Sequence, residues 1–531
     1  MAAMHSAAVP LVALTLVAAL SSQEQPAPAR EQRVAVVKIA LATQDPIDMA
    51  FGAVAAKAAT FHGAKVIDWD GRDTKALCAL LADANAPTDI LFFVRPERFH
   101  MMLHRSILLS LCDLDGDALL DATFGYMTAR DAKTLDGLWQ RTEAMHRGGL
   151  RSRVWHSVGV TTGMRSTTYP GHRSELEKAA GFAGDSFYFG CVENDPDVRK
   201  FVAATMPRLA EASVLTFSGN GDPQGIWLFE GKRNSKRELH WDYEPQRVGS
   251  DPDGAMPRVL ADQVRAQTLA SPIVWSGTCH CAATHDVWLE GDIVSTFGKA
   301  KTGTVHELPL EQSLGLAFLD AGACALLAPV GPNHGLAVLR ETSFALQHGA
   351  SLGEILKSTY DDVLLAAKGP LRLDLAVDGV IQKNGEHVMQ GGGANRVLLG
   401  DPTLRPFRAT ADARETVRVE PAKDGAFTVH VEWAAGFHAR GWDMFGTDRQ
   451  RGASVPVRIA ADTLLPASCT NVRATVRGSL ATGEELPLVL GHAVLETFAG
   501  RRWLHLQANG PRDVVEGKAL RVAFEVAPAK D

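Results

Sequence analysis

In two segments of this 531-residue chain, an apolar run is followed directly by residues that could form a nucleophilic site. The segment 213–229 continues into Ser-Gly-Asn-Gly-Asp and presents Asn220 and Gly221, whereas the segment 272–286 presents Cys279 after Ser-Gly-Thr. Covalent catalysis by cysteine needs a thiolate, a group that moves its proton, and N–H donors for an oxyanion. If the two runs are neighbouring parallel strands, the loops after them meet at one sheet edge, where active-site clefts form. The spacing therefore predicts a thiol site formed by Cys279 and the Asn220 turn.

The elements that must position this site are predicted by the apolar pattern of residues 33–410. Near-continuous apolar runs are typical of parallel strands covered on both faces, and they occur at 34–40, 65–69, 89–94, 213–217, 272–276 and 323–330. Amphipathic stretches lie between them: 310–322 has one apolar face and ends at Gly322, and another helix begins with a capping box of Ser351 and Glu354. This alternation predicts an α/β fold with a parallel sheet flanked by helices.

After about residue 412 the apolar period changes to two, which is typical of half-buried strands. Seven short segments alternate apolar with polar residues, at 416–420, 427–433, 454–460, 471–476, 486–490, 503–507 and 520–526. Seven strands in about 120 residues predict an immunoglobulin-like β-sandwich over 411–531. No cysteine pair is placed to bridge its two sheets, so an antibody-type domain is not implied.

Composition and length favour a soluble, multidomain protein. Apolar residues make up 46% of the chain and charged residues 22%, and the formal net charge is −7. This balance gives no reason to expect a nucleic-acid or anionic-membrane partner. A chain of this length exceeds what one core usually supports, so two or three domains are expected.

The first 22 residues predict a secretory signal peptide. They contain an uncharged run over 7–19 followed by small residues, although no Lys or Arg precedes the run. The run is too short to favour a membrane-spanning helix, and no other apolar segment of spanning length follows. The polar, Pro-rich residues 23–32 predict a disordered lead-in. We therefore expect a protein that is secreted, periplasmic or associated with the cell surface.

Seven cysteines are too sparse for a disulfide framework: Cys78, Cys112, Cys191, Cys279, Cys281, Cys324 and Cys469. The Cys279-His280-Cys281 triplet has no second Cys/His pair at finger-like spacing, so structural zinc is not favoured there. Cys281 is expected to be either a close-set disulfide partner or an inert buried thiol, and Cys78, Cys112 and Cys324 are expected to be buried.

Taken in order, these landmarks resemble the gingipain-type family of secreted cysteine peptidases over roughly residues 33–530. The landmarks are the acidic segment 113–132, the glycine turn 219–221, the cysteine loop 276–281, the helix and strand of 310–331, and the exit motif LLGDPTLRPF at 398–407. The Gly-Asp-Pro-Xaa-Leu-Arg string is the most specific of them. The resemblance implies a caspase-like sheet in two subdomains, 33–150 and 151–410, followed by the sandwich.

The resemblance also implies roles for the residues of the two loops. Cys279 matches the position of the family's nucleophile, with Gly277, Thr278 and His280 supporting the loop or the oxyanion. Asn220 stands where the family has a histidine, beside the matching Gly221. Because an amide cannot accept a proton from a thiol, hydrolysis through this mechanism needs another base.

A candidate base is His334. In a caspase-like sheet the strand after the nucleophile strand lies beside it, and here that strand leads into 329–337. His334 would then lie at the same sheet edge as Cys279. The alternative is an ordinary loop histidine. The histidines nearer in sequence, His280 and His285, are expected to be structural or solvent-exposed, since neighbours on an extended strand point away from each other.

Two acidic features have alternative interpretations. Asp113, Asp115 and Asp117 could bind a structural Ca²⁺ through carboxylate oxygens, but Ala118 stands where an EF-hand loop needs glycine, and a solvated loop is the alternative. Asp222 could line a substrate pocket for a basic side chain or orient a base. It could equally organise its own turn.

Two functions follow from these residues. The first is an exported cysteine endopeptidase that hydrolyses polypeptides and requires no cofactor. The second is a catalytically inactive homologue that binds peptides or assembles in the cell envelope. A cysteine enzyme that transfers acyl groups would use the same nucleophile and is not separated from these by sequence.

Overall fold

A computed structural model describes most of the chain between residues 33 and 529. The described residues are 33–84, 86–112, 114, 119–160, 181–183, 186–189, 204–218, 221–227, 258–288, 305–331, 341–342, 345, 349–366, 395–407, 415–433, 453–498, 500–510 and 519–529. The predicted signal peptide and lead-in lie outside them. Asn220, His334, Asp113, Asp115 and Asp117 also lie outside them.

A ten-stranded sheet forms the centre of residues 33–407. Its strands, in spatial order, are β2 (Lys65–Trp69), β1 (Val34–Ile39), β3 (Asp89–Phe93), β4 (Thr123–Met127), β15 (Arg396–Leu399), β14 (Ala325–Pro329), β11 (Ile273–Ser276), β7 (Val214–Ser218), β5 (Trp155–Val160) and β6 (Ser186–Phe189). Every neighbouring pair is parallel except β14 and β15. All six predicted strands are present, and the predicted α/β class is confirmed.

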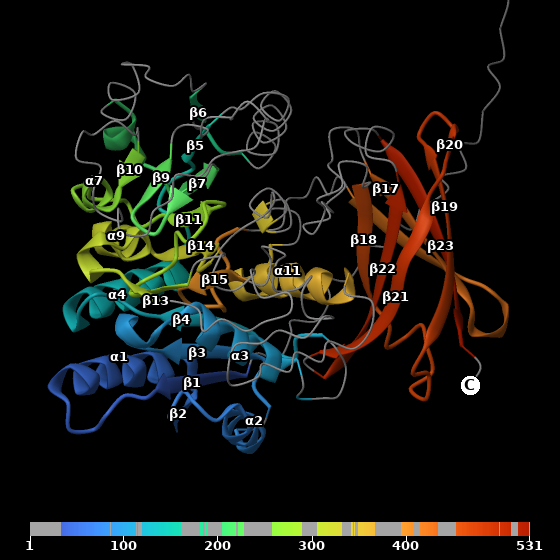
Figure 1. Ribbon diagram of the computed structural model, residues 1–531. Helices are drawn as coiled ribbons and strands as arrows, with labels where there is room; N and C mark the ends of the chain where they lie inside the picture. The colour runs from blue at the N-terminus through green and yellow to red at the C-terminus, as the bar shows by residue number, and fades with distance from the viewer. Residues whose placement is uncertain are drawn as a thin grey trace, which may run out of the picture. The chain divides into compact units, whose positions relative to one another are not determined.

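Helices pack against this sheet as the amphipathic pattern predicts. They are α1 (Pro46–His62), α2 (Thr74–Asp83), α3 (Met101–Leu111), α4 (Ala132–Gly148), α7 (Ala261–Arg265), α9 (Leu314–Ala321) and α11 (Leu352–Ala366). Two of them, α1 and α4, lie side by side (Figure 1) and are joined by an ion pair of 2.6 Å between Lys57 and Asp136. The predicted capping box is present, since the Ser351 N–H donates to Glu354 and the Glu354 N–H donates to Ser351 Oγ.

The predicted helix over 310–322 is divided into two parts. A 3₁₀ turn, η4 (Leu310–Gln312), precedes Ser313, whose Oγ accepts the N–H of Leu316 and thereby begins α9. The helix ends at Gly322 with a φ of 118°, as the glycine predicts. The helix therefore begins later than the apolar pattern predicts, because the side chain of Ser313 caps its first turn.

The sheet is continuous across the predicted boundary at residue 150. Strands β1 to β4 come from 33–150 and the other six from 151–410, and β15 of the second set pairs with β4 of the first. One cluster of buried apolar side chains includes residues of both segments, for example Phe92, Tyr126, Trp155 and Trp275. The two sets of strands therefore share one core, and the predicted subdomain and domain boundaries stay predictions.

Residues 415–529 form two antiparallel sheets with a shared apolar core. One contains β16 (Glu415–Pro421), β17 (Phe427–Trp433), β23 (Leu520–Pro528), β19 (Val472–Leu480) and β20 (Glu485–Leu486); the other contains β18 (Ala453–Ala460), β22 (Arg501–Gly510) and β21 (Val489–Phe498). Val429 and Phe524 of the first sheet and Leu504 and Leu506 of the second belong to the same buried cluster. The predicted β-sandwich is confirmed, and its immunoglobulin-like topology stays a prediction.

One strand prediction in this region is wrong. The segment 486–490 is not a single strand, because β20 ends at Leu486 and β21 begins at Val489. Pro487 lies between them and has no N–H to donate to a ladder. In the part of the chain that the structure describes, no helix is long and apolar enough to cross a membrane.

Candidate functional site

The two strands that precede the predicted site are neighbours in the sheet (Figure 1). In the parallel pair of β7 and β11, Phe217 lies opposite Ser276, and the N–H of Gly277 donates to the carbonyl of Phe217 at 2.9 Å. The carboxyl ends of both strands therefore lie side by side on the same side of the sheet. Gly221 and Cys279 therefore follow the ends of two neighbouring parallel strands.

Gly221 brings the two loops into direct contact. A Cβ atom built on Gly221 would lie 2.6 Å from the carbonyl oxygen of Gly225 and closer still to the Cγ2 of Thr278. Contacts below 3.0 Å essentially never occur for real Cβ atoms. The backbone of the turn therefore packs against the residue immediately before Cys279, and only glycine fits there.

Backbone hydrogen bonds hold the loop that carries Cys279. The N–H groups of Gly277, Thr278 and His280 each donate to an oxygen of the protein, at 2.9, 3.2 and 2.9 Å. His280 has a φ of 57°, in the left-handed region that favours glycine. The chain therefore turns sharply just after Cys279, and these three residues support the loop through their main-chain N–H groups.

The two cysteines of the loop differ in environment. Cys279 is partly exposed, whereas Cys281 is fully buried and hydrogen-bonded to the side chain of Ser276. Burial raises the pKa of Cys281 to about 12, and burial likewise raises the pKa of Cys324 to about 12. Of the two expectations for Cys281, the inert buried thiol is right, and Cys279 is the reactive candidate of the pair.

This difference predicts a pattern of alkylation. At pH 8 we expect iodoacetamide to modify Cys279 and to leave Cys281 and Cys324 unmodified, since a thiol with a pKa near 12 is ionised in only about one molecule in ten thousand at that pH. Raising the pH to 9 should increase that fraction about tenfold and still leave both buried thiols protected. Peptide mapping by mass spectrometry measures the modification. Alkylation of Cys281 at a rate similar to that of Cys279 would contradict the assignment.

A buried ion pair, which the sequence analysis missed, supports the end of β11. The Arg396 guanidinium is fully buried and pairs with both carboxylate oxygens of Glu341, with Nε lying 2.8 Å from Oε1. Its Nη1 donates to the carbonyl of Ser276, the last residue of β11. The available signal for a buried charge was the arginine directly before the apolar residues 397–399.

The described chain before His334 ends at Gly331, beside the cysteine loop. Strand β14 lies next to β11 as predicted, and Gly331 accepts the N–H of His280 while Pro329 accepts the N–H of Ala282. His334 itself lies outside the described residues, so its role as a base stays a prediction. His285 is held by a 2.9 Å hydrogen bond between its Nδ1 and the carbonyl of Leu308, in keeping with a structural role.

Asp222 organises its own turn. Its Oδ1 accepts the N–H groups of Gln224 and Gly225 at 2.8 and 2.9 Å, and these bonds close the hairpin between β8 (Gly221–Asp222) and β9 (Gly225–Trp227). These contacts favour the turn interpretation, while its part in a substrate pocket stays a prediction. The three aspartates of the possible Ca²⁺ site lie outside the described residues, and that site also stays a prediction.

Comparisons with known proteins add little to this geometry. No protein-family model and no curated protein matches the chain. A solved structure described as "Complex of Porphyromonas gingivalis RgpB pro- and mature domains" is 10% identical, with coverage of 92% of this chain and 99% of that chain and a TM-score of 0.38. Another, described as "Structure of Protease", is 10% identical, with 91% coverage of both chains and a TM-score of 0.40. At these scores the likenesses carry no argument about activity.

Proposed function

We propose that this chain is an exported, gingipain-like cysteine peptidase in which Cys279 attacks the carbonyl carbon of a peptide bond. The observation that carries the proposal is the packing of the Gly221 turn against Thr278, at the carboxyl ends of two adjacent parallel strands. This packing supports a site in which residue 220 and Cys279 act on one substrate. Peptide hydrolysis is the reaction of the family that the sequence resembles.

The chemistry assigns distinct roles to the loop. The Cys279 thiolate adds to the carbonyl carbon, the carbonyl oxygen becomes an oxyanion, and collapse of this intermediate expels the amine and leaves a thioester. Water then hydrolyses the thioester and restores the thiol. Because the N–H groups of Gly277, Thr278 and His280 already donate within the protein, the oxyanion takes its donors from other groups.

Proton transfer needs a group other than Asn220. The thiol must lose a proton before attack, and the leaving amine must gain one. His334 is the proposed base because it lies three residues after Gly331, whose carbonyl accepts the N–H of His280 in the cysteine loop. An imidazole there can accept the thiol proton and return it to the amine.

One observation favours a second function. Asn220 stands at the position of the family's histidine, and its amide can hydrogen-bond a peptide without moving a proton. The same site could then bind a polypeptide without cleaving it, as an inactive homologue in the cell envelope would. Both functions place the protein outside the cytoplasm, in agreement with the predicted signal peptide.

Labelling of Cys279 by peptidyl acyloxymethyl ketones tests the proposal. The mature protein is treated with a panel of these electrophiles and followed by intact mass, beside Cys279→Ala and His334→Ala variants. We expect one label per chain, lost in both variants and retained in the matched controls Cys281→Ala and His430→Ala. A chain that takes no label, while iodoacetamide still alkylates Cys279, would favour the inactive homologue.

A further inference from the structure

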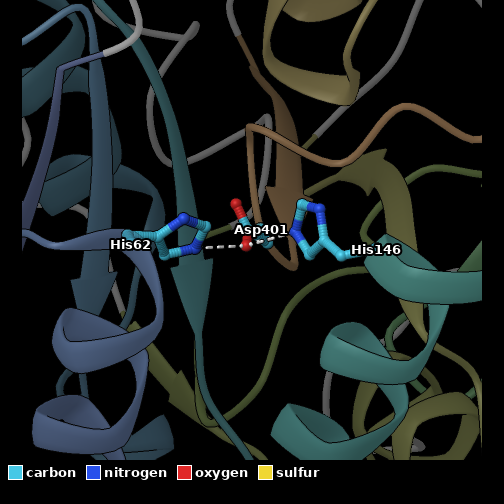
Figure 2. Close-up of side chains that lie close together, drawn as sticks. All are labelled: His62, His146 and Asp401. Atoms are coloured by element: carbon cyan, nitrogen blue, oxygen red, sulfur yellow. Dashed lines mark hydrogen bonds and ion pairs between the residues drawn. The ribbon is translucent and has the colours of Figure 1, made fainter.

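Two histidines converge on one buried carboxylate at a distance from the cysteine loop. The Nε2 atoms of His62 and His146 each lie 2.9 Å from Oδ2 of Asp401, and Figure 2 shows both rings pointing at that oxygen. His62 ends α1, His146 lies in the last turn of α4, and Asp401 follows β15. Three segments that are far apart in the sequence thus bring two imidazole nitrogens and one carboxylate oxygen together.

This cluster and Cys279 lie at opposite ends of the strands of the sheet. Strand β15 runs antiparallel to β14, and β14 runs parallel to β11. The carboxyl end of β15, where Asp401 lies, is therefore at the edge where β11 begins, whereas Cys279 follows the end of β11. The cluster is separate from the proposed peptidase site, and its function does not depend on that proposal.

The local structure fixes the direction of the carboxylate. Oδ1 of Asp401 accepts both the N–H and the hydroxyl of Thr403, each at 2.8 Å, which leaves Oδ2 directed at the histidines. The N–H of Gly400 donates to Tyr126 of β4 at 2.8 Å, so the turn before Asp401 is anchored to the sheet. Partners that orient a ligand in this way are typical of metal sites.

The donor set is chemically suited to a divalent transition-metal ion. Two imidazole nitrogens and one carboxylate oxygen are ligands that Zn²⁺ takes at about 2.0–2.2 Å in tetrahedral sites. Ligand atoms of a tetrahedral zinc ion lie about 3.3–3.5 Å apart. Each nitrogen now lies 2.9 Å from Oδ2, so these two spacings would widen by about half an ångström. Asp401 is fully buried and the side chains of His62 and His146 are 8% and 18% exposed, so the ion would be largely shielded from water.

Charge supports the same conclusion. The Asp401 carboxylate is fully buried, and a buried charge is usually paired or bound to a metal. The rings of Phe61 and Trp139 pack against His62, with centroid distances of 5.0 and 5.8 Å, so apolar groups form part of the surroundings. We propose that His62, His146 and Asp401 bind one zinc ion, which fastens α1 and α4 to the end of β15.

Such an ion would stabilise the centre of the sheet. Strand β15 lies between β4 and β14, where the two sets of strands meet. A metal bound to the folded chain alone shifts the unfolding equilibrium by mass action, so zinc raises the unfolding temperature. The effect is on stability, and its readout is independent of peptidase activity.

The test measures zinc binding by the full mature chain without an affinity tag. The protein is stripped with a chelator, dialysed and titrated with Zn²⁺ by calorimetry, and the Co²⁺ form is examined by visible absorption. We expect one ion per chain, tetrahedral Co²⁺ bands and a higher unfolding temperature with zinc. The His146→Gln variant should bind at least about 100-fold more weakly, because loss of a ligand costs no less than loss of an orienting partner.

Glutamine at position 146 separates a metal site from a hydrogen-bonded cluster. Its amide can still donate to Asp401, so a cluster held by hydrogen bonds alone keeps its stability, whereas the zinc response is lost. His430→Gln, which changes a half-buried histidine paired with Glu420 at 3.1 Å, is the matched control and should bind zinc like the wild type. Cys279→Ala should also bind normally, which excludes zinc held by the reactive thiol.

The outcomes decide the proposal. No zinc uptake by the wild type, or equal uptake by wild type and His146→Gln, would overturn it. If His146→Gln does not fold, Thr403→Ala replaces it as the test. Loss of the hydroxyl that orients Asp401 should weaken zinc binding about 10- to 100-fold, and unchanged affinity in that variant would count against the site.

Discussion

Replacing Arg396 by methionine is expected to lower the free energy of unfolding by about 3–5 kcal/mol, because it leaves the buried carboxylate of Glu341 without its partner. The guanidinium and this carboxylate are both fully buried, and Arg396 also donates to the carbonyls of Ser276 and Leu327. The change removes all of these bonds at once. Urea denaturation of wild type and variant, followed by circular dichroism, measures the loss.

Arg405 provides the matched control, since it pairs with Glu354 at 3.0 Å but its side chain is 48% exposed. Arg405→Met should cost no more than about 1 kcal/mol. A double variant, Arg396→Met with Glu341→Leu, should regain much of the stability because no buried charge is left alone. Cys279 should react with peptidyl electrophiles more slowly in both Arg396→Met variants than in the wild type, because the carbonyl of Ser276 loses its donor in each. Equal losses for Arg396→Met and Arg405→Met would contradict the account of the buried pair.

The second large effect is expected for Gly221→Ala. The new methyl group would collide with Thr278 and with the carbonyl oxygen of Gly225, so the turn and the cysteine loop would have to separate. Such overpacking costs about 1–3 kcal/mol. A shift of the loop should also slow peptidyl electrophile labelling of Cys279 by about tenfold or more, since misplacement of a reacting group is costly. Labelling reactions are stopped at successive times and analysed by intact mass, which gives the rate of labelling.

Two further variants identify the cause. Gly148→Ala changes a glycine at the end of α4 where no atom lies within 4 Å of the added carbon, and it should label at the wild-type rate. Gly221→Ala combined with Thr278→Ser removes the methyl group on the opposite side of the collision and should recover part of the labelling rate. Full activity of Gly221→Ala alone would show that the two loops are not in contact.

The sequence predicted the features that depend on local pattern. The apolar runs at 213–217 and 272–276 were recognisable as buried strands, which the structure shows as Val214–Ser218 and Ile273–Ser276, and their pairing followed from parallel topology. The capping box at Ser351 and the helix end at Gly322 were predicted because each is decided by a few neighbouring residues. The split at Pro487 could have been predicted in the same way, because proline interrupts a ladder wherever it occurs.

The features that sequence analysis missed depend on contacts between distant residues. Asp401 meets a histidine 339 positions away and another 255 positions away, and no local pattern connects them. The pairing of Arg396 with Glu341 likewise depends on how β15 is inserted between β4 and β14. The left-handed φ of His280 could not be predicted either, because a positive φ is uncommon for every residue other than glycine.

The most direct test of the central claim is hydrolysis of a diverse peptide library by the purified mature chain, with products identified by mass spectrometry. The proposal predicts cleavage products that appear with the wild type and with Cys281→Ala and are absent with Cys279→Ala. Peptides that are bound but not cut, or cleavage that persists in Cys279→Ala, would contradict the assignment of Cys279 as the nucleophile of a peptidase.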